Sequence, residues 1–206
     1  NRLPAAWLIG VDGKVLWAGN PAESEGELDA LIEAELAKVK APRLGRTNLD
    51  RAVMPAAAKF QKHDYAGARK EAEKVAAKDG ASEAAKADAQ FVVDRIAAIG
   101  ARQSEAAKKA DDGKSYLEAS ELYASLAQAF KGAPEGEAAA ARLKEMKGDA
   151  AVQREIKAAE MLRRLCGELE GKPADVRKAQ LDAFAKNRKF DGTKAASDAQ
   201  ALAQKG

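Results

Sequence analysis

Cysteine and histidine are nearly absent from this sequence. Cys166 and His63 are the only examples among 206 residues. A single cysteine excludes an intrachain disulfide, a cysteine-based zinc site and a dithiol centre within these residues. A single histidine excludes a multi-histidine metal site, and the sequence has no glycine-rich phosphate loop and no G-x-S-x-G motif. We therefore expect no catalytic residue, no metal and no cofactor in this chain.

The sequence also lacks a large excess of either positive or negative charge, and it lacks long apolar runs. Lys plus Arg is 35 and Asp plus Glu is 32, so the formal net charge is only +3. Because nucleic-acid-binding proteins usually gather basic charge on one face, we expect no nucleic-acid partner. No apolar run approaches the roughly 18 residues that a membrane helix needs. We therefore expect no membrane span.

Alanine, in contrast, makes up about a quarter of the residues. Alanine is the best helix former, and its small side chain lets helices approach closely. Apolar residues recur at helical spacing from Thr47 onward, with Pro55 expected to kink or restart the first helix. A capping box is expected at Ser115 and Glu118. The sequence predicts a mainly α protein, with an N-terminal β-hairpin and helix followed by an antiparallel array of helical hairpins.

The hairpin is expected within the first nineteen residues. Two apolar runs, AAWLIG and KVLWAG, occupy residues 5–10 and 14–19 and are joined by Val11-Asp12-Gly13. Asp-Gly between two apolar runs is a strong hairpin signal. Both runs are continuous rather than alternating, which is typical of strands covered on both faces. A two-stranded hairpin alone is marginal in water, so these strands need partners.

Residues 3–19, LPAAWLIGVDGKVLWAG, together with the amphipathic helix that follows, resemble part of a known family. They look like the C-terminal half of a bacterial thioredoxin-like domain of the extracytoplasmic thiol–disulfide oxidoreductase type. The matching hairpin positions are Leu8, Ile9, Asp12, Gly13, Lys14 and Val15, while Gly10 stands where the family commonly has Asp.

The resemblance implies that Pro4 is the family's cis-proline, which lies beside the active-site cysteines and helps bind substrate. The alternative is that Pro4 merely starts an edge strand. The chain has no initiator Met, so we expect either that a precursor was processed or that the upstream part of a longer protein is absent. The resemblance implies that the family's first half, which carries Cys-x-x-Cys, lies upstream of Asn1 in a longer parent protein. The resemblance further implies a periplasmic location and a redox activity that would belong to the parent protein.

An internal repeat runs through the helical part. Residues 63–85 match 114–139 and, more loosely, 174–196. The corresponding positions are Tyr65, Tyr116 and Val176, then Ala68, Ala119 and Ala179, then Gly80, Gly132 and Gly192. This unit is similar to tetratricopeptide repeats, although its spacing is irregular. The alternative is an ordinary alanine-rich bundle in which the similarity is compositional.

These features suggest three segments. We place the C-terminal part of a thioredoxin-like domain at residues 1–40, a linker at 41–47 and a helical repeat domain at 48–206. The stretch KVKAPRLGR carries four cations with a proline and a glycine. It is expected to be a solvated linker rather than a phosphate site, because no aromatic residues are interleaved.

The remaining candidate residues have simple structural interpretations. His63, next to Asp64, is expected to place a cation near a helix C-terminus rather than to form a catalytic dyad. Cys166 is expected to be a small buried apolar residue rather than a reactive thiol. The candidates for contact with a protein partner are Tyr65, Tyr116 and Tyr123.

The functional expectation combines the resemblance with the repeats. The chain is expected to be the non-catalytic portion of a thioredoxin-like redox protein whose helical extension mediates protein–protein interaction. The alternative is a purely structural or assembly scaffold that self-associates through its N-terminal strands, because unpaired sheet edges invite strand addition.

Overall fold

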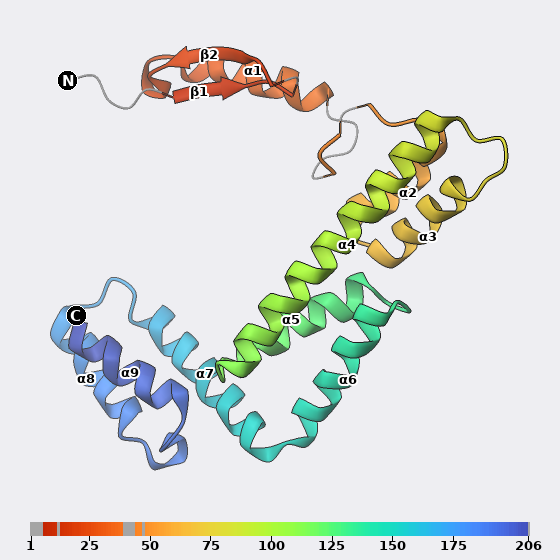
Figure 1. Cartoon of the computed structure of the whole chain (residues 1–206). Helices are drawn as coiled ribbons and strands as arrows, with labels where there is room; N and C mark the ends of the chain where they lie inside the picture. Colours follow the sequence, from red (N-terminus) through yellow and green to blue (C-terminus); the bar gives the residue numbers. More distant parts are fainter. Residues whose placement is uncertain (1–5, 12, 39–43, 47, 206) are drawn as a thin grey trace. The chain divides into compact units, whose positions relative to one another are not determined.

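The computed structural model describes residues 6–11, 13–38, 44–46 and 48–205. Within these ranges the chain forms nine α-helices and two antiparallel strands, which confirms the mainly helical fold predicted from the sequence (Figure 1). Over the same ranges, no helix combines the length and the apolar character that crossing a bilayer requires. The chain divides into two compact units, residues 1–96 and 97–206, and their boundary lies inside a helix, α4 (Glu83–Asp112).

The first unit begins with the predicted hairpin. Strands β1 (Ala6–Ile9) and β2 (Val15–Gly19) pair Trp7 with Ala18 and Ile9 with Val15, with a register shift after Leu8. The short 3-10 turn η1 (Pro21–Glu23) leads to α1 (Glu25–Lys38). The hairpin loop is joined to α1 by a hydrogen bond in which the Val11 amide donates to Oε2 of the buried Glu35, at 2.9 Å.

The described residues leave one face of the hairpin open. Trp7 is 65% exposed, and Ile9 and Val15 are similarly open to solvent. Strand partners point to the same side of a sheet, so these three side chains share one face. The partly buried Leu8 and Trp17 lie on the opposite face. The two strands therefore carry more apolar side chains than the described part of the chain buries.

The remaining helices of the first unit follow the sequence signals closely. A 3-10 turn, η2 (Arg51–Val53), precedes α2 (Met54–Gln61), whose first turn contains Pro55, so the proline restarts the helix. Helix α3 (Tyr65–Ala76) packs on α2 and is capped by Asp64, whose carboxylate accepts the Gly67 amide.

The end of the predicted linker is only partly solvated. Leu44 is fully buried, and the Arg46 guanidinium forms an ion pair with Asp88 of α4. The same guanidinium lies 4.2 Å from the centroid of the Phe91 ring. Asp88 also accepts the backbone amide of Asp50 at 2.7 Å. Asp88 and Phe91 of α4 therefore hold Arg46, because Arg can combine an ion pair with ring contact.

The second unit contains the C-terminal part of α4 and five further helices. They are α5 (Tyr116–Ala129), α6 (Pro134–Gly148), α7 (Ala150–Glu168), α8 (Ala174–Ala185) and α9 (Lys194–Lys205), with the 3-10 turn η3 (Arg188–Phe190) between the last two. Helix α5 packs on α6 and α7, and α8 packs on α9, which also contacts α7.

Two turns of the repeat have the same backbone geometry. His63 and Lys114 both adopt left-handed φ angles, 60° and 57°. The next residue's amide donates to the carbonyl five residues earlier in each turn, from Asp64 to Lys59 and from Ser115 to Ala110. A tyrosine and a fully buried alanine, Ala68 or Ala119, follow each turn. The first two repeat units therefore share a structural element as well as composition.

The third repeat unit lacks this turn and shares with the first two units only a second turn, which contains a glycine. Gly80, Gly132 and Gly192 have φ angles of 76°, 77° and 73°, and in each case the next amide donates to the carbonyl three residues earlier. Only glycine adopts this conformation at no steric cost. However, Val176 and Ala179, the third unit's counterparts of the tyrosine and alanine, are exposed. That part of the alignment was wrong, because α8 instead buries Leu181 and Phe184.

The predicted capping box at Ser115 is also wrong. Ser115 occupies the N-cap of α5, yet its side chain makes no capping hydrogen bond. Its ψ angle of 58° departs from the extended conformation that a capping serine usually adopts. The left-handed turn at Lys114 imposes this local geometry.

Two glycines in the second unit make room for Phe130, whose ring is fully buried. A Cβ placed on Gly100 would lie 3.1 Å from Cζ of Phe130. A Cβ on Gly136 would lie only 2.1 Å from the Phe130 carbonyl oxygen. Only a hydrogen atom therefore fits at Gly136 of α6, while a methyl group at Gly100 of α4 would require its neighbours to shift by a few tenths of an ångström.

Candidate functional site

Three adjoining cavities in the second unit follow helix α7. The middle cavity, of about 330 Å³, shares Lys114, Tyr116 and Glu155 with a cavity of about 320 Å³ near the start of α7. It shares Cys166 and Leu202 with a cavity of about 560 Å³ near the end of α7. We call this continuous depression the α7 groove.

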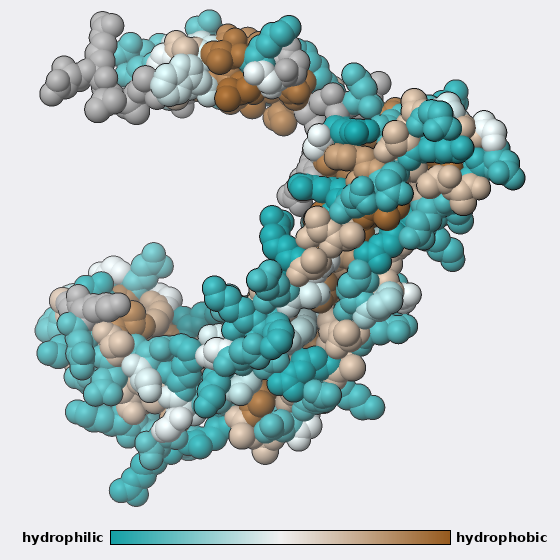
Figure 2. Space-filling view, viewed as in Figure 1, coloured by the Kyte–Doolittle hydropathy of each residue, from teal (hydrophilic) through white to brown (hydrophobic). Residues whose placement is uncertain are grey.

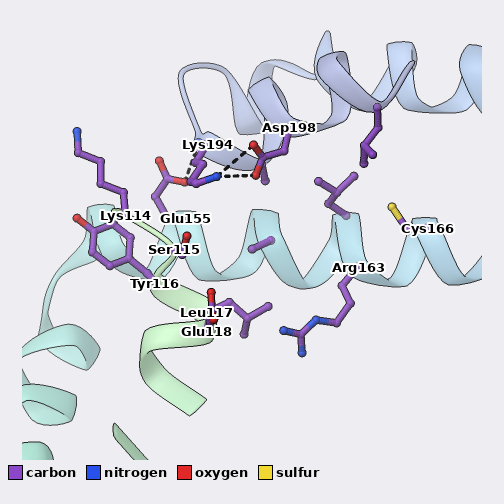
Figure 3. Close-up of a pocket in the computed structure, with 14 residues that line it drawn as sticks. Lys114, Ser115, Tyr116, Leu117, Glu118, Glu155, Arg163, Cys166, Lys194 and Asp198 are labelled. Carbon is purple, nitrogen blue, oxygen red and sulfur yellow. Dashed lines mark hydrogen bonds and ion pairs between the residues drawn. The ribbon is translucent and has the colours of Figure 1, made fainter. Parts of the chain in front are cut away.

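The middle of the groove lies between three elements. Its floor comes from α7, with Ala159, Leu162 and Cys166. Lys194 and Asp198 of α9 lie on one side of α7 in Figure 3, while Lys114, Tyr116 and Glu118 come from the α4–α5 turn and the start of α5. An apolar floor with polar rims is the usual composition of a binding depression.

Charged groups in the middle of the groove are mostly engaged with one another. Glu155 Oε2 accepts the Lys194 amide at 3.0 Å, so a carboxylate of α7 stabilises the N-terminus of α9. The Lys194 ammonium is 2.9 Å from Asp198 Oδ2 (Figure 3). Arg163 binds both carboxylate oxygens of Glu121, which lowers the pKa of Glu121. Apart from Lys114 and Glu118, which form no ion pair within the described residues, the charged groups that line the middle of the groove are therefore engaged.

Backbone contacts position α9 beside α7. Arg154 donates from Nε to the Lys189 carbonyl at 3.0 Å and from Nη2 to the Asp191 carbonyl at 2.6 Å. Thr193 caps α9, since its Oγ1 accepts the Ala196 amide at 3.2 Å. These bonds hold the turn before α9 against α7 and so define one wall of the groove.

Arg177 and Lys178 dominate the polar rim of the largest cavity. Both are exposed on α8, and within the described residues neither forms an ion pair. Glu170 is the one carboxylate in the lining of this cavity. The floor is apolar and includes Leu169, Leu181 and Leu202.

The predicted tyrosines have three different environments. Tyr116 lines two of the cavities in the groove. Tyr65 is buried, with its ring centroid 5.1 Å from that of Phe60, so it serves core packing. Tyr123 is partly buried, and its hydroxyl is 3.4 Å from Asp111 Oδ2. The structure therefore brings one of the three candidates to the groove.

Tyr123 belongs to a cluster centred on Asp111. Arg142 of α6 binds Asp111 with two hydrogen bonds, at 2.6 and 2.9 Å, and also contacts Glu145. Arg142 lowers the pKa of Asp111, while burial and the adjacent carboxylate raise the pKa of Tyr123. A bidentate pair of this kind fixes the register of α6 against the end of α4.

Pro4 lies outside the described residues, and the other candidates are placed as follows. His63 ends the turn after α2, and its ring stacks on Tyr65 with centroids 5.9 Å apart. Its neighbour Asp64 caps α3, as described above. Cys166 is half-buried and lines two cavities of the groove, so it is less enclosed than predicted.

The described residues contain no group of three or more His, Cys, Asp or Glu side chains arranged to hold a metal ion. The groove itself was missed in the sequence, because its walls come from segments about 40 residues apart. Glu155 and Lys194 are separated by 39 residues. The exposure of Leu202 beside the groove is evident only from the structure.

The open face of the hairpin is a second candidate surface. Trp7, Ile9 and Val15 form it, and apolar side chains are visible at the surface of this part of the molecule in Figure 2. Over the residues that the structure describes, β1 and β2 pair only with each other.

We compared the whole chain with protein-family models, curated proteins and solved structures. None of the three comparisons finds a match for this chain.

Proposed function

We propose that this chain is the non-catalytic portion of a thioredoxin-like redox protein and that its helical region binds a protein partner. In this proposal, residues 1–40 complete a thioredoxin-like sheet whose dithiol lies in a preceding segment. The helical region then brings the partner to the redox domain. The irregular tetratricopeptide-like organisation of the helices is part of the same proposal.

The open face of the hairpin carries the proposal. Trp7 is a large apolar side chain, and leaving it in water forgoes roughly 2 kcal/mol or more of burial free energy. Helix α1 follows the hairpin and is bonded to its loop through Glu35, while the face with Trp7, Ile9 and Val15 stays exposed. A sheet normally needs a layer on its apolar face, and further strands and helices of a thioredoxin-like half would supply it.

The α7 groove supports the partner-binding half of the proposal. Its cavities are concave, apolar at the floor and polar at the rim. No constellation of catalytic side chains lies among the groove residues described above. A surface of this composition favours binding over chemistry.

Tryptophan quenching tests the sheet-completion step, because both tryptophans lie in the hairpin. Acrylamide should quench Trp7 strongly in the 206-residue chain carrying Trp17→Phe, and much less in the natively expressed polypeptide with the same change. The Trp7→Phe variant, which retains the half-buried Trp17, is the matched control. Equal quenching of Trp7 in both proteins would contradict the proposal.

The intact mass and disulfide-reductase activity of the natively expressed polypeptide test the redox step. We expect a mass above 21.8 kDa, a Cys-x-x-Cys in the added segment, and reductase activity that is lost when those cysteines become serine. A native N-terminus at Asn1 without reductase activity would refute the redox assignment.

The unpaired edges of β1 and β2 favour one alternative, a structural scaffold that assembles through these strands. Light scattering distinguishes this alternative from the proposed redox function. A dimer that becomes monomeric when residues 1–22 are deleted supports strand-mediated assembly, and a monomer at all concentrations excludes it.

A further inference from the structure

We propose that the α7 groove binds an extended segment of about eight residues from a partner protein, apolar in its middle and acidic at both ends. This inference rests on the proposed function, because it specifies the partner that the helical region recognises. It concerns the second unit alone.

The length follows from the extent of the groove. The lining runs from Ala151 to Glu170, nearly the whole of α7. At 1.5 Å per residue, this stretch of helix is about 28 Å long. An extended chain rises about 3.3 Å per residue, so about eight residues span the groove.

The apolar middle follows from the floor. Ala159, Leu162 and Cys166 line the central cavity, and Leu202 lines both this cavity and the larger one. Leu202 is 42% exposed although it lies on the side of α9 that borders the groove. An apolar side chain of the bound segment would remove this surface from water.

The acidic ends follow from the charges that remain unengaged. At the end bordered by α8, Arg177 and Lys178 lack ion-pair partners in the described chain and outnumber Glu170. At the opposite end, Asp149 and Glu155 accept backbone amides and Arg154 donates to backbone carbonyls. Lys114 is therefore the one charged side chain of that lining without a hydrogen bond or ion pair in the described chain. Carboxylates near both ends of a ligand complement this distribution, and the middle needs none.

The test uses the full 206-residue chain and a fluorescein-labelled peptide, Glu-Asp-Leu-Ala-Ala-Leu-Asp-Glu. One control peptide carries lysine at the four acidic positions, and a second carries serine at the four apolar positions. Fluorescence anisotropy at moderate salt should show tighter binding of the first peptide than of either control, by about tenfold or more.

Variants then locate the site. Reversing two rim charges in Arg177→Glu/Lys178→Glu should weaken binding of the acidic peptide by about tenfold and improve binding of the lysine peptide. Leu202→Ser should weaken binding of the acidic peptide without changing the preference between charges. Lys157→Glu is the matched control, because Lys157 is exposed on α7 and lies outside the lining of the groove. Its affinity should be unchanged, and circular dichroism verifies that each variant is folded.

Three results would overturn the inference. They are equal binding of the acidic and lysine peptides, binding that a folded Arg177→Glu/Lys178→Glu variant retains, and a dimer of this chain that the same double change dissociates. The last result would assign the groove to a second copy. A native polypeptide without a dithiol would refute the redox part of the proposed function but leave the peptide result standing, so the two failures are distinguishable.

Discussion

Replacing Gly136 with alanine would place a methyl group against the main chain of the preceding turn. Gly136 lies in the first turns of α6, and its added Cβ would be 2.1 Å from the Phe130 carbonyl oxygen. Cβ atoms essentially never approach other heavy atoms closer than 3.0 Å. The start of α6 must therefore move by roughly an ångström away from α5, because neither atom belongs to a flexible side chain.

The expected cost is the difference between two opposing effects. Alanine is favoured over glycine within a helix by about 1 kcal/mol. Overpacking of a buried contact costs about 1–3 kcal/mol, and more when backbone has to shift. We therefore expect Gly136→Ala to lower the free energy of unfolding by about 2 kcal/mol, which corresponds to a Tm lower by about 4–8 °C.

Gly167→Ala is the matched control. Gly167 lies inside α7, and nothing stands within 4 Å of its added Cβ. This variant should gain stability by about 0.5–1 kcal/mol from helix propensity alone. Thermal unfolding followed by far-ultraviolet circular dichroism measures both, whereas tryptophan fluorescence reports only on the hairpin. A Gly136→Ala protein that melts at or above the temperature of Gly167→Ala would refute the steric reasoning.

Three further changes have expected outcomes. Arg142 lowers the pKa of Asp111 below its usual 3.8, so the ionised carboxylate stabilises the fold above about pH 4, and this contribution is lost as pH falls through the lowered value. Asp111→Asn should therefore be less stable at pH 7 and lose less stability between pH 5 and pH 2, and urea titrations with equal pH dependence would contradict this. Gly192→Ala should lower the free energy of unfolding by about 1 kcal/mol, because Gly192 has a φ of 73°, which a residue with a Cβ adopts only under strain. Gly148→Ala is the control, because an added Cβ also meets nothing within 4 Å there but the φ angle lies outside the left-handed region, so its Tm should not fall. Phe130→Ala should cost about 3–5 kcal/mol through cavity formation, seen as a lower urea midpoint with little change in slope, and a midpoint near that of the parent chain would show that the site collapses fully.

Helix positions could be predicted because their signals are local. Asp64 caps α3, Pro134 lies in the first turn of α6, and Gly132 makes the turn between α5 and α6. Each of these residues acts on backbone within a few positions of itself, so its effect is visible in a short stretch of sequence. The mainly helical fold follows from many such signals acting in agreement.

Contacts between distant segments could not be predicted in this way. The contacts of Arg46 with Asp88 and Phe91 depend on α4 lying beside it, which no short pattern encodes. The α7 groove likewise depends on Arg154 and Glu155 binding the backbone before and at the start of α9. Long-range polar bonds of this kind determine which candidate residues become neighbours.

The third repeat unit illustrates the same limit within a single helix. Aligning Val176 and Ala179 with the first two units preserved the letters but put both side chains on the solvent face of α8. The apolar residues that α8 buries, Leu181 and Phe184, lie further along the helix. Matching the large apolar residues instead of the small ones would have indicated the buried face of α8.

The placement of Cys166 has a practical consequence for spectroscopy. It is the only thiol in these 206 residues, and it lies where the two larger cavities of the groove meet. A maleimide dye or nitroxide label would therefore attach at one position without any mutagenesis. Changes in its emission or mobility would report occupancy at the centre of the groove, and filling the shared cavity with the label itself should compete with a bound segment.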